Sequence, residues 1–304
     1  LANGNVGIGT TSPFAKLSIT GVGTTTGAVF QAANSSDSPL FTILDNGNVG
    51  IGSSSPSARL ALSGGNFLQT VTTQPRVKGT VSIPSASNGI GVYVVGRYAY
   101  SVDSGSGFKL SVIDISDPSS PTIVGSVTDV VNLSGAFTVK VAGRYAYVTA
   151  TGSGRLAVID ISNPAVPVVV GTLGGTELAG ARGLHVSGRY AYVASNSSDT
   201  LAVVDIANPA APVLAGSVAS STALGNPDSV YVLGKYAYVT GAQLGSSLAV
   251  VDVSNPANPT IVGSIVDVIN LGNAKDVVVS GRYAYVLSQS ANGLAVVDVG
   301  DPAA

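Results

Sequence analysis

The stretch Gly188-Arg189-Tyr190-Ala191-Tyr192, followed within ten residues by Leu201-Ala202-Val203-Val204-Asp205, decides the fold because the chain repeats it. The tripeptide Tyr-Ala-Tyr starts at Tyr98, Tyr145, Tyr190, Tyr236 and Tyr283, with spacings of 47, 45, 46 and 47 residues. Each copy follows a glycine and a basic residue, and an apolar run ending in Asp comes after it. Self-similarity at this period is the signature of a repeat architecture.

One unit contains four short strands. A Val-rich strand precedes the glycine, the Tyr-Ala-Tyr strand and the apolar strand ending in Asp follow, and a last strand such as residues 122–127 comes after a Pro-x-x-Pro turn. A four-stranded unit of about 40–50 residues is typical of a β-propeller blade. Residues 201–204 are apolar on both faces, as expected for a sheet covered on both sides. The alternation of Tyr and Ala predicts that a large face of one blade meets a small face of the next.

The two ends of the repeat array favour a closed ring. The fifth unit stops at residues 301–304, before its fourth strand, whereas residues 75–81 (PRVKGTV) match the pattern of the other fourth strands. Pro75 precedes Tyr98 by 23 residues, and the equivalent internal gaps are 24, 23, 24 and 24. We therefore predict an all-β, five-bladed propeller over residues 75–304, in which residues 75–83 complete the last blade and remove an exposed edge. The sequence leaves open whether this strand closes its own ring or that of a neighbouring copy.

A second repeat occupies the N-terminal segment, residues 1–74. The motif in residues 3–19 (NGNVGIGTTSP, then AKL) recurs at residues 46–62, and Asn-Gly between short apolar runs predicts a hairpin. The second copy follows the strand-like residues 41–44, whereas the first begins abruptly, so we expect the coded polypeptide to be longer. Each copy has too few large apolar residues for a core of its own, so burial must come from other chains or neighbouring repeats. Residues 63–74 form a Gly- and polar-rich linker.

Composition excludes several classes of function. The chain of 304 residues has no Cys, Met or Trp, so disulfide, thiolate and zinc–cysteine chemistry are impossible, and little is left for oxidants outside a cell to attack. Charged residues make up 10%, with 14 basic and 16 acidic side chains, which leaves no electrostatic footprint for nucleic acid or an anionic membrane. No apolar run is long enough to span a bilayer.

Residues repeated in every unit are predicted to belong to the scaffold. A ring of carboxylates could bind cations, but these Asp residues end a strand before a turn, which favours a structural role: Asp114, Asp160, Asp205, Asp252 and Asp298. The base before each Tyr-Ala-Tyr is interpreted in the same way, within a Gly-led turn: Arg97, Arg144, Arg189, Lys235 and Arg282.

Unrepeated residues give no catalytic, cofactor or metal site. His185 is the only histidine, in a position held elsewhere by Tyr93, Lys140, Tyr231 and Val278, and is interpreted as a tolerated strand residue. A propeller glycosidase needs a carboxylate pair. Glu177 is the only glutamate, and the remaining propeller Asp residues are predicted to lie singly in loops: Asp103, Asp129, Asp199, Asp228, Asp267 and Asp276. Residues 45–48 (DNGN) lack the alternating ligands of a calcium loop and are assigned to a hairpin turn.

Variable loops on the constant scaffold are the predicted recognition surface. The loops within blades are 101–109, 148–155, 193–200, 239–247 and 286–293, and those between blades are 126–138, 172–183, 217–229 and 264–276. Because Trp is absent, stacking on sugars would depend on Tyr93, Tyr231, Phe108 or Phe137.

The runs at residues 201–205 and 248–252 (both LAVVD) resemble the LVIVD-repeat family of bacterial and archaeal surface β-propellers, over residues 75–304. The N-terminal motif resembles the GNVGIGTTSP repeats of phage tail fibres and bacterial surface fibres, where such segments form trimeric stalks. These resemblances imply an extracellular, non-enzymatic protein. We expect a fibre or filament subunit that associates with its own copies, and as alternatives an adhesin that binds a surface glycan or protein, or a hydrolase using the central channel.

Overall fold

The computed structural model describes residues 5–23, 25–63, 75–83, 89–105, 107–242 and 246–301. The chain forms two compact units, residues 1–76 and residues 77–304. The predicted linker 63–74 lies outside the described residues except for Ser63, and so does the start of the first N-terminal repeat.

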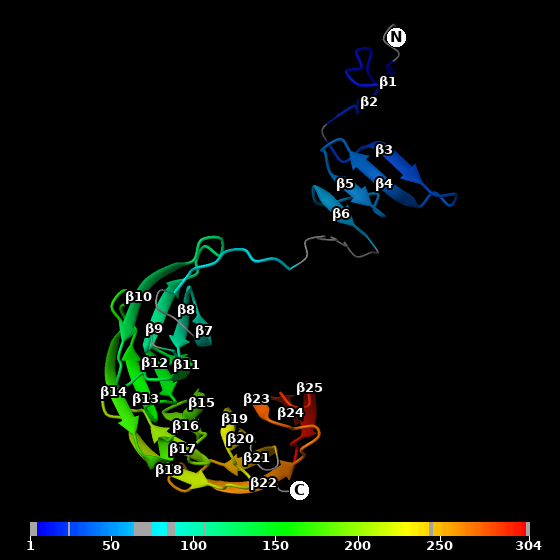
Figure 1. The fold of residues 1–304 in the computed structure, drawn as a ribbon. Helices are drawn as coiled ribbons and strands as arrows, with labels where there is room; N and C mark the ends of the chain where they lie inside the picture. Colours follow the sequence, from blue (N-terminus) through cyan, green and yellow to red (C-terminus); the bar gives the residue numbers. More distant parts are fainter. Residues whose placement is uncertain are drawn as a thin grey trace. The chain divides into compact units, whose positions relative to one another are not determined.

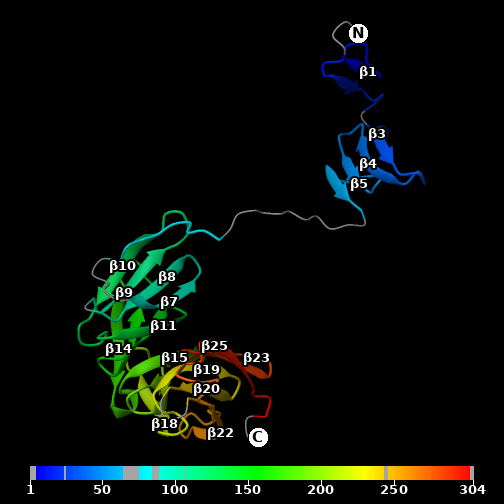
Figure 2. The same cartoon turned by 45° about the vertical axis from the view of Figure 1, so that its right-hand side comes forward.

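The second unit consists of five antiparallel sheets that follow one another in chain order along an arc (Figures 1 and 2). The first blade contains β7 (Gly89–Val95), β8 (Tyr98–Asp103), β9 (Lys109–Asp114) and β10 (Thr122–Thr128). The second contains β11 (Ala136–Ala142), β12 (Tyr145–Ala150), β13 (Arg155–Asp160) and β14 (Val168–Gly174). The third contains β15 (Ala181–Ser187), β16 (Tyr190–Ser195), β17 (Thr200–Asp205) and β18 (Val213–Ala219). The fourth contains β19 (Pro227–Leu233), β20 (Tyr236–Gly241), β21 (Ser247–Asp252) and β22 (Thr260–Val266), and the fifth contains β23 (Ala274–Ser280), β24 (Tyr283–Ser288) and β25 (Gly293–Asp298).

The repeated motifs fix the local structure of each blade as predicted. Tyr-Ala-Tyr begins the second strand, and the repeated Asp ends the third. The glycine before the base has a φ of 57–61° in every copy, as Gly143 and Gly188 illustrate, although a Cβ there would meet nothing within 4 Å. Backbone conformation alone therefore requires glycine in this turn, because other residues reach positive φ only with strain.

The core of the propeller lies between successive blades, in four apolar clusters among the described residues. The cluster between the second and third blades contains Tyr147 from one and Ala191 from the other. The cluster between the third and fourth blades likewise contains Tyr192 and Ala237. The prediction that a large face meets a small face is confirmed by these pairs. Each connection between blades also contributes a buried leucine that the repeat pattern did not predict, namely Leu133, Leu178, Leu224 and Leu271.

A glycine in the fourth strand lets each blade approach the proline turn of the next. A Cβ on Gly171 would lie 2.1 Å from the carbonyl oxygen of Pro209, and one on Gly125 would lie 2.2 Å from that of Pro164. Gly79 has the same surroundings, since its Cβ would lie 2.5 Å from the carbonyl oxygen of Pro118. Residues 77–83 therefore lie against the first blade where the fourth strand of a preceding blade would lie.

The structure contradicts the prediction that residues 75–83 close the ring of their own chain. Residues 75–83 form no strand, and the fifth sheet is three-stranded in the described part of the chain, in the order β23-β24-β25. The facing surfaces of the end blades are bare: Val92 is 67% exposed on the first, and Leu294 is 62% exposed on the fifth. The Pro-x-apolar-x-Gly pattern reflects the contact of the segment with the following blade. It does not specify which strand the segment pairs with, so it could not predict closure of the ring.

The N-terminal unit contains two small sheets with the same repeated element. β1 (Val6–Ile8) pairs in parallel with β2 (Leu17–Ile19), and β5 (Val49–Ile51) pairs in parallel with β6 (Leu60–Leu62). β3 (Ala28–Ala33) and β4 (Pro39–Leu44) complete the second sheet. In both copies an asparagine side chain donates to a proline carbonyl eight residues on, from Asn5 to Pro13 at 3.2 Å and from Asn48 to Pro56 at 3.0 Å.

The hairpin prediction for this unit is confirmed at the second copy, whereas Asn3 and Gly4 of the first copy lie outside the described residues. The turn at residues 45–48 joins the antiparallel strands β4 and β5, and Asn46 Oδ1 accepts a hydrogen bond from the Asn48 amide at 3.0 Å. Within each repeat, however, the two strands are parallel, because the turn-rich residues between them carry the chain back to the start of the first strand. Parallel pairing needs a crossover connection, which the Asn-Gly signal does not encode.

Candidate functional site

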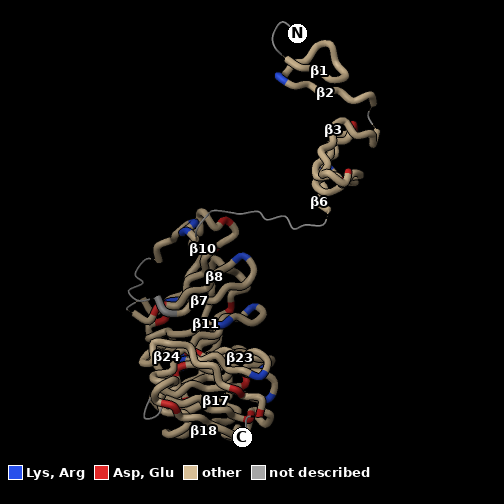
Figure 3. Tube along the Cα trace, turned by 90° about the vertical axis from the view of Figure 1, so that its right-hand side faces the viewer, with Lys and Arg blue, Asp and Glu red and all other residues tan. Residues whose placement is uncertain are grey.

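The residues repeated in every blade form a scaffold, as predicted, and they bind one another. The antiparallel register places the residue after each base opposite the repeated Asp, for example Tyr145 opposite Asp160. Five ion pairs result, at Arg97–Asp114, Arg144–Asp160, Arg189–Asp205, Lys235–Asp252 and Arg282–Asp298. Basic and acidic residues accordingly lie near one another along the propeller (Figure 3).

The repeated carboxylates also cap the turn that follows them. Asp160 Oδ1 accepts the Ser162 amide at 2.8 Å, and Asp252 Oδ1 accepts the Ser254 amide at 2.8 Å. The hydrogen bonds from Ser162 and Arg144 lower the pKa of Asp160 to about 2. Both oxygens of Asp160 thus have partners within its own blade, and the carboxylate is not directed at a ligand.

The candidate ligand site is the channel bordered by the innermost strands of all five blades, a cavity of about 620 Å³. β7, β11, β15, β19 and β23 each contribute residues to its wall. Each of these strands has an irregular register near its start, as between Ala136 and Thr138 in β11. Such bulges change the direction of a side chain, and here the residues beside them line the channel.

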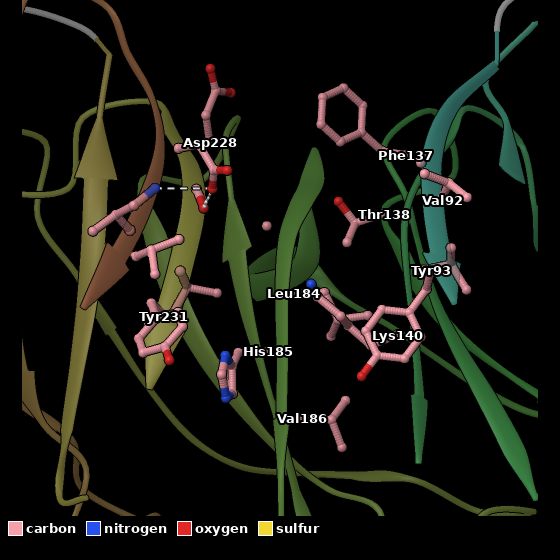
Figure 4. Close-up of a pocket in the computed structure, with 18 of the residues that line it drawn as sticks. Val92, Tyr93, Phe137, Thr138, Lys140, Leu184, His185, Val186, Asp228 and Tyr231 are labelled. Atoms are coloured by element: carbon pink, nitrogen blue, oxygen red, sulfur yellow. Dashed lines mark hydrogen bonds between the residues drawn. The ribbon is translucent and has the colours of Figure 1, made fainter. Parts of the chain in front are cut away.

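The upper tier of the channel is an ion-pair network around Asp228 (Figure 4). Asp228 Oδ1 lies 2.5 Å from Arg182 Nη1 and accepts a hydrogen bond from Asn196 Nδ2 at 3.2 Å. Asp228 Oδ2 lies 2.5 Å from Lys275 Nζ, and the Asp228 side chain is only 4% exposed. Both of its oxygens are therefore occupied by cations and an amide. Arg182 additionally lies over the Phe137 ring, 5.3 Å from its centroid.

The lower tier of the channel is aromatic and carries one cation. Tyr93, Lys140, His185 and Tyr231 occupy equivalent positions on four successive inner strands, and all four are half-buried. Lys140 Nζ lies 5.4 Å from the Tyr93 ring centroid, and the His185 and Tyr231 rings meet edge to face at 5.1 Å. Burial and then the nearby Lys140 lower the pKa of His185.

The structure corrects the assignment of three acidic residues to loops. Asp228 and Asp276 lie in β19 and β23 and line the channel, not in loops as predicted, and Asp103 ends β8. The signal was present, because Asp228 and Lys275 occupy the same position in the repeat as Phe137 and Arg182. The remaining loop residues accept backbone amides: Asp129 from Asn132 at 2.9 Å, Asp199 from Asn226 at 2.8 Å, and Asp267 from Asn270 at 2.9 Å.

The channel brings together two acidic residues and the only histidine of the chain. Asp276 and His185 line the same channel as Asp228, but the two oxygens of Asp228 are held, and Asp276 Oδ1 accepts the Ser229 hydroxyl at 2.7 Å. Glu177 lies in the short 3-10 helix Thr176–Leu178 and is not part of the channel wall. The described residues include no cluster of three or more potential metal ligands, and no helix among them is long and apolar enough to cross a membrane.

A second hollow, of about 430 Å³, lies among the variable loops of the second and third blades. Its wall comes from residues 151–155, 174–175 and 179–180 together with Ser197. These loops belong to the predicted recognition surface, and the structure brings three of them together. Residues 243–245 of the loop 239–247, and residue 106 of the loop 101–109, lie outside the described residues.

The repeats match the family model of the LVIVD repeat at residues 88–129, 135–173, 180–220, 224–267 and 271–304. The chain belongs to the LVIVD-repeat family. No curated protein matches it.

Solved structures share the fold at low identity. A protein from Lactobacillus plantarum has a TM-score of 0.61 at 16% identity, covering 71% of this chain and 69% of that one. A functionally unknown protein from Desulfotomaculum acetoxidans has a TM-score of 0.59 at 12% identity, covering 70% and 69%. The periplasmic gluconolactonase of Pseudomonas aeruginosa has a TM-score of 0.57 at 16% identity, and the match spans 68% of this chain but only 65% of that chain. At these identities the likeness shows a β-propeller-like fold alone.

Proposed function

We propose that this LVIVD-repeat protein is a non-enzymatic structural subunit of an extracellular fibre or filament, and that its N-terminal unit associates with further copies. The observation that carries this proposal is the lack of a core in that unit. Leu44 is its one buried large apolar side chain in the part that the structure describes. By contrast, Ile8 and Ile51, which are equivalent in the two repeats, are 56% and 46% exposed.

Apolar side chains cover much of the surface of these small sheets. Val6, Phe14, Leu17, Phe30, Leu40, Leu60 and Leu62 are also exposed. A segment of this size gains its stability from buried apolar area, and contiguous exposed apolar surface marks an interaction site. Association with the same unit of other copies would cover these residues. The absence of Cys and Met supports an oxidising location.

The oligomeric state of the full chain tests the proposal. We expect light scattering after size exclusion to give a mass several times 30.0 kDa. The double variant Ile8→Ser/Ile51→Ser should shift the protein toward the monomer, whereas the control Val166→Ser, at a site 61% exposed in the propeller, should not. A full chain that remains monomeric at about 0.1 mM would overturn the proposal, because this concentration is well above the dissociation constants of ordinary stable assemblies.

A second candidate function, an adhesin that binds a glycan or a protein, is favoured by the hollow among the loops. Gly174, Gly175 and Gly180 leave backbone accessible there, and Ser153 and Arg155 supply polar side chains. Binding sites of this kind combine a concave surface with a few directed polar groups. A glycan array with the full chain, compared with an Arg155→Ala/Ser153→Ala variant, tests this function, and equal signals from both proteins would exclude the hollow as the site.

A further inference from the structure

The lower tier of the central channel contains a cation that the protein does not neutralise. Among the described residues Lys140 has no ion-pair partner. Lys275, the other cation of the channel wall, binds Asp228, and so does the neighbouring Arg182. The Lys140 ammonium contacts the Tyr93 ring instead, and it is close enough to His185 to lower the pKa of that imidazole. Single charges of this kind in a half-buried cavity favour an anionic ligand.

The groups around Lys140 supply donors and ring surfaces but no second free cation. Tyr93 and Tyr231 each carry a phenolic hydroxyl, and His185 carries an imidazole N–H. Tyr231 and His185 lie on the neighbouring strands β19 and β15 and meet edge to face, so the two rings lie next to one another in the channel wall (Figure 4). One ammonium balances one negative charge. The charged groups above it, Arg182, Lys275, Asp228 and Asp276, carry two positive and two negative charges, and both cations bind Asp228.

We propose that the channel binds a small organic monoacid that carries a polar ring, with its carboxylate on Lys140 and its ring against Tyr93, His185 and Tyr231. A cavity of about 620 Å³ is large enough for a monosaccharide acid and far larger than a bare anion requires. A carboxylate is chosen over a phosphate because a single cation is available. This site consists of residues other than the apolar ones of the N-terminal unit. The proposed ligand binding can therefore be tested independently of the proposed fibre assembly.

His185 gives a direct readout, because it is the only histidine in the chain and yields one imidazole signal in NMR spectra. Glucuronate is the probe, at constant pH and ionic strength, with glucose and acetate as matched ligands that lack the charge or the ring. We expect glucuronate to shift the His185 signal saturably, with a Kd of about 1 mM, as is usual for a small solvent-accessible ligand. Glucose and acetate should each bind about tenfold more weakly, which is the effect of losing one good interaction.

Variants distinguish binding at Lys140 from a general effect of the net charge of the protein on glucuronate binding. Lys140→Gln should weaken glucuronate binding about tenfold or more, and Lys140→Arg should retain it. Arg59→Gln, which removes a cation of the N-terminal unit, should leave binding unchanged. If Lys140→Gln is unstable, the Lys140→Arg variant still tests the proposal, because it retains the positive charge and should bind glucuronate. Absence of any saturable shift overturns the proposal. So does equal binding of glucose, which would remove the role of the carboxylate, or equal binding of acetate, which would remove the role of the ring.

Discussion

Arg144 donates a hydrogen bond to Asp160 across neighbouring strands of the second blade, with Nη2 2.7 Å from Oδ2. The same pairing of base and acid recurs in every blade, and each base also lies over the tyrosine that follows it, as Arg144 does over Tyr145 at 5.1 Å. One polar cluster per blade thus joins the Gly-led turn, the second strand and the end of the third strand. Two motifs that looked independent in the sequence are halves of one structural unit.

These clusters predict acid sensitivity. The pKa of Asp160 is about 2 in the folded chain, and those of Asp114, Asp205, Asp252 and Asp298 are also lowered. A carboxyl whose pKa falls on folding stabilises the native state above its unfolded pKa near 3.9, and that stabilisation is lost as the pH falls toward the folded value. Urea unfolding should show a decline in the free energy of unfolding between about pH 4 and 2. A separate, single-group decline is expected between about pH 7 and 5, because the pKa of His185 is lowered in the folded chain. A free energy that stays level down to pH 2 would contradict the prediction.

The fourth-strand glycines should resist substitution for steric reasons. Gly171→Ala places a Cβ 2.1 Å from the Pro209 carbonyl oxygen, which belongs to the backbone of the next blade and cannot rotate away. We expect a loss of about 1–3 kcal/mol in the free energy of unfolding, as for overpacked cores. Gly188→Ala should cost about 1–2 kcal/mol for a different reason, namely its φ of 57°.

Gly293→Ala is the matched control for both glycine variants. Its φ is not in the left-handed region, and its Cβ would meet no atom closer than 3.7 Å. Denaturant unfolding should find this variant within about 0.5 kcal/mol of the parent. Equal losses at Gly171 and Gly293 would mean that close approach between blades is not what selects glycine.

The sequence predicted the blades well because each blade is encoded locally and five times over. Tyr-Ala-Tyr, the Gly-led turn and the Asp that ends the third strand all depend on residues within one unit. The channel was harder to predict, because Arg182, Asp228 and Lys275 come from three blades and only the ring-like arrangement brings them together. Closure failed for a related reason: Gly79 has the environment of a fourth-strand glycine, but no local pattern specifies which strand it pairs with.

Two leucines at the same position of the repeat can show whether the exposed surface of the fifth blade is covered by another surface in solution. Leu156 in β13 is completely buried, whereas Leu294 in β25 is 62% exposed. Leu156→Ala should lower the free energy of unfolding by about 2–5 kcal/mol, and Leu294→Ala by about 0.5 kcal/mol or less. Chemical unfolding of both variants tests this contrast. A loss at Leu294 as large as the one at Leu156 would show that another surface covers the fifth blade.

Hydrogen exchange should distinguish residues 77–83 from the true fourth strands. Residues 168–174 form β14 and pair with β13, whereas residues 77–83 lie on the first blade without a ladder to any described strand. Amides without a partner exchange at rates set by local opening, and those inside a packed sheet are protected up to the global stability. We expect mass spectrometry to show rapid exchange over 77–83 and slow exchange over 168–174. Strong protection of 77–83 at all protein concentrations would mean that the segment pairs with its own fifth blade, and protection that grows with concentration would mean that it pairs with the β25 edge of another copy.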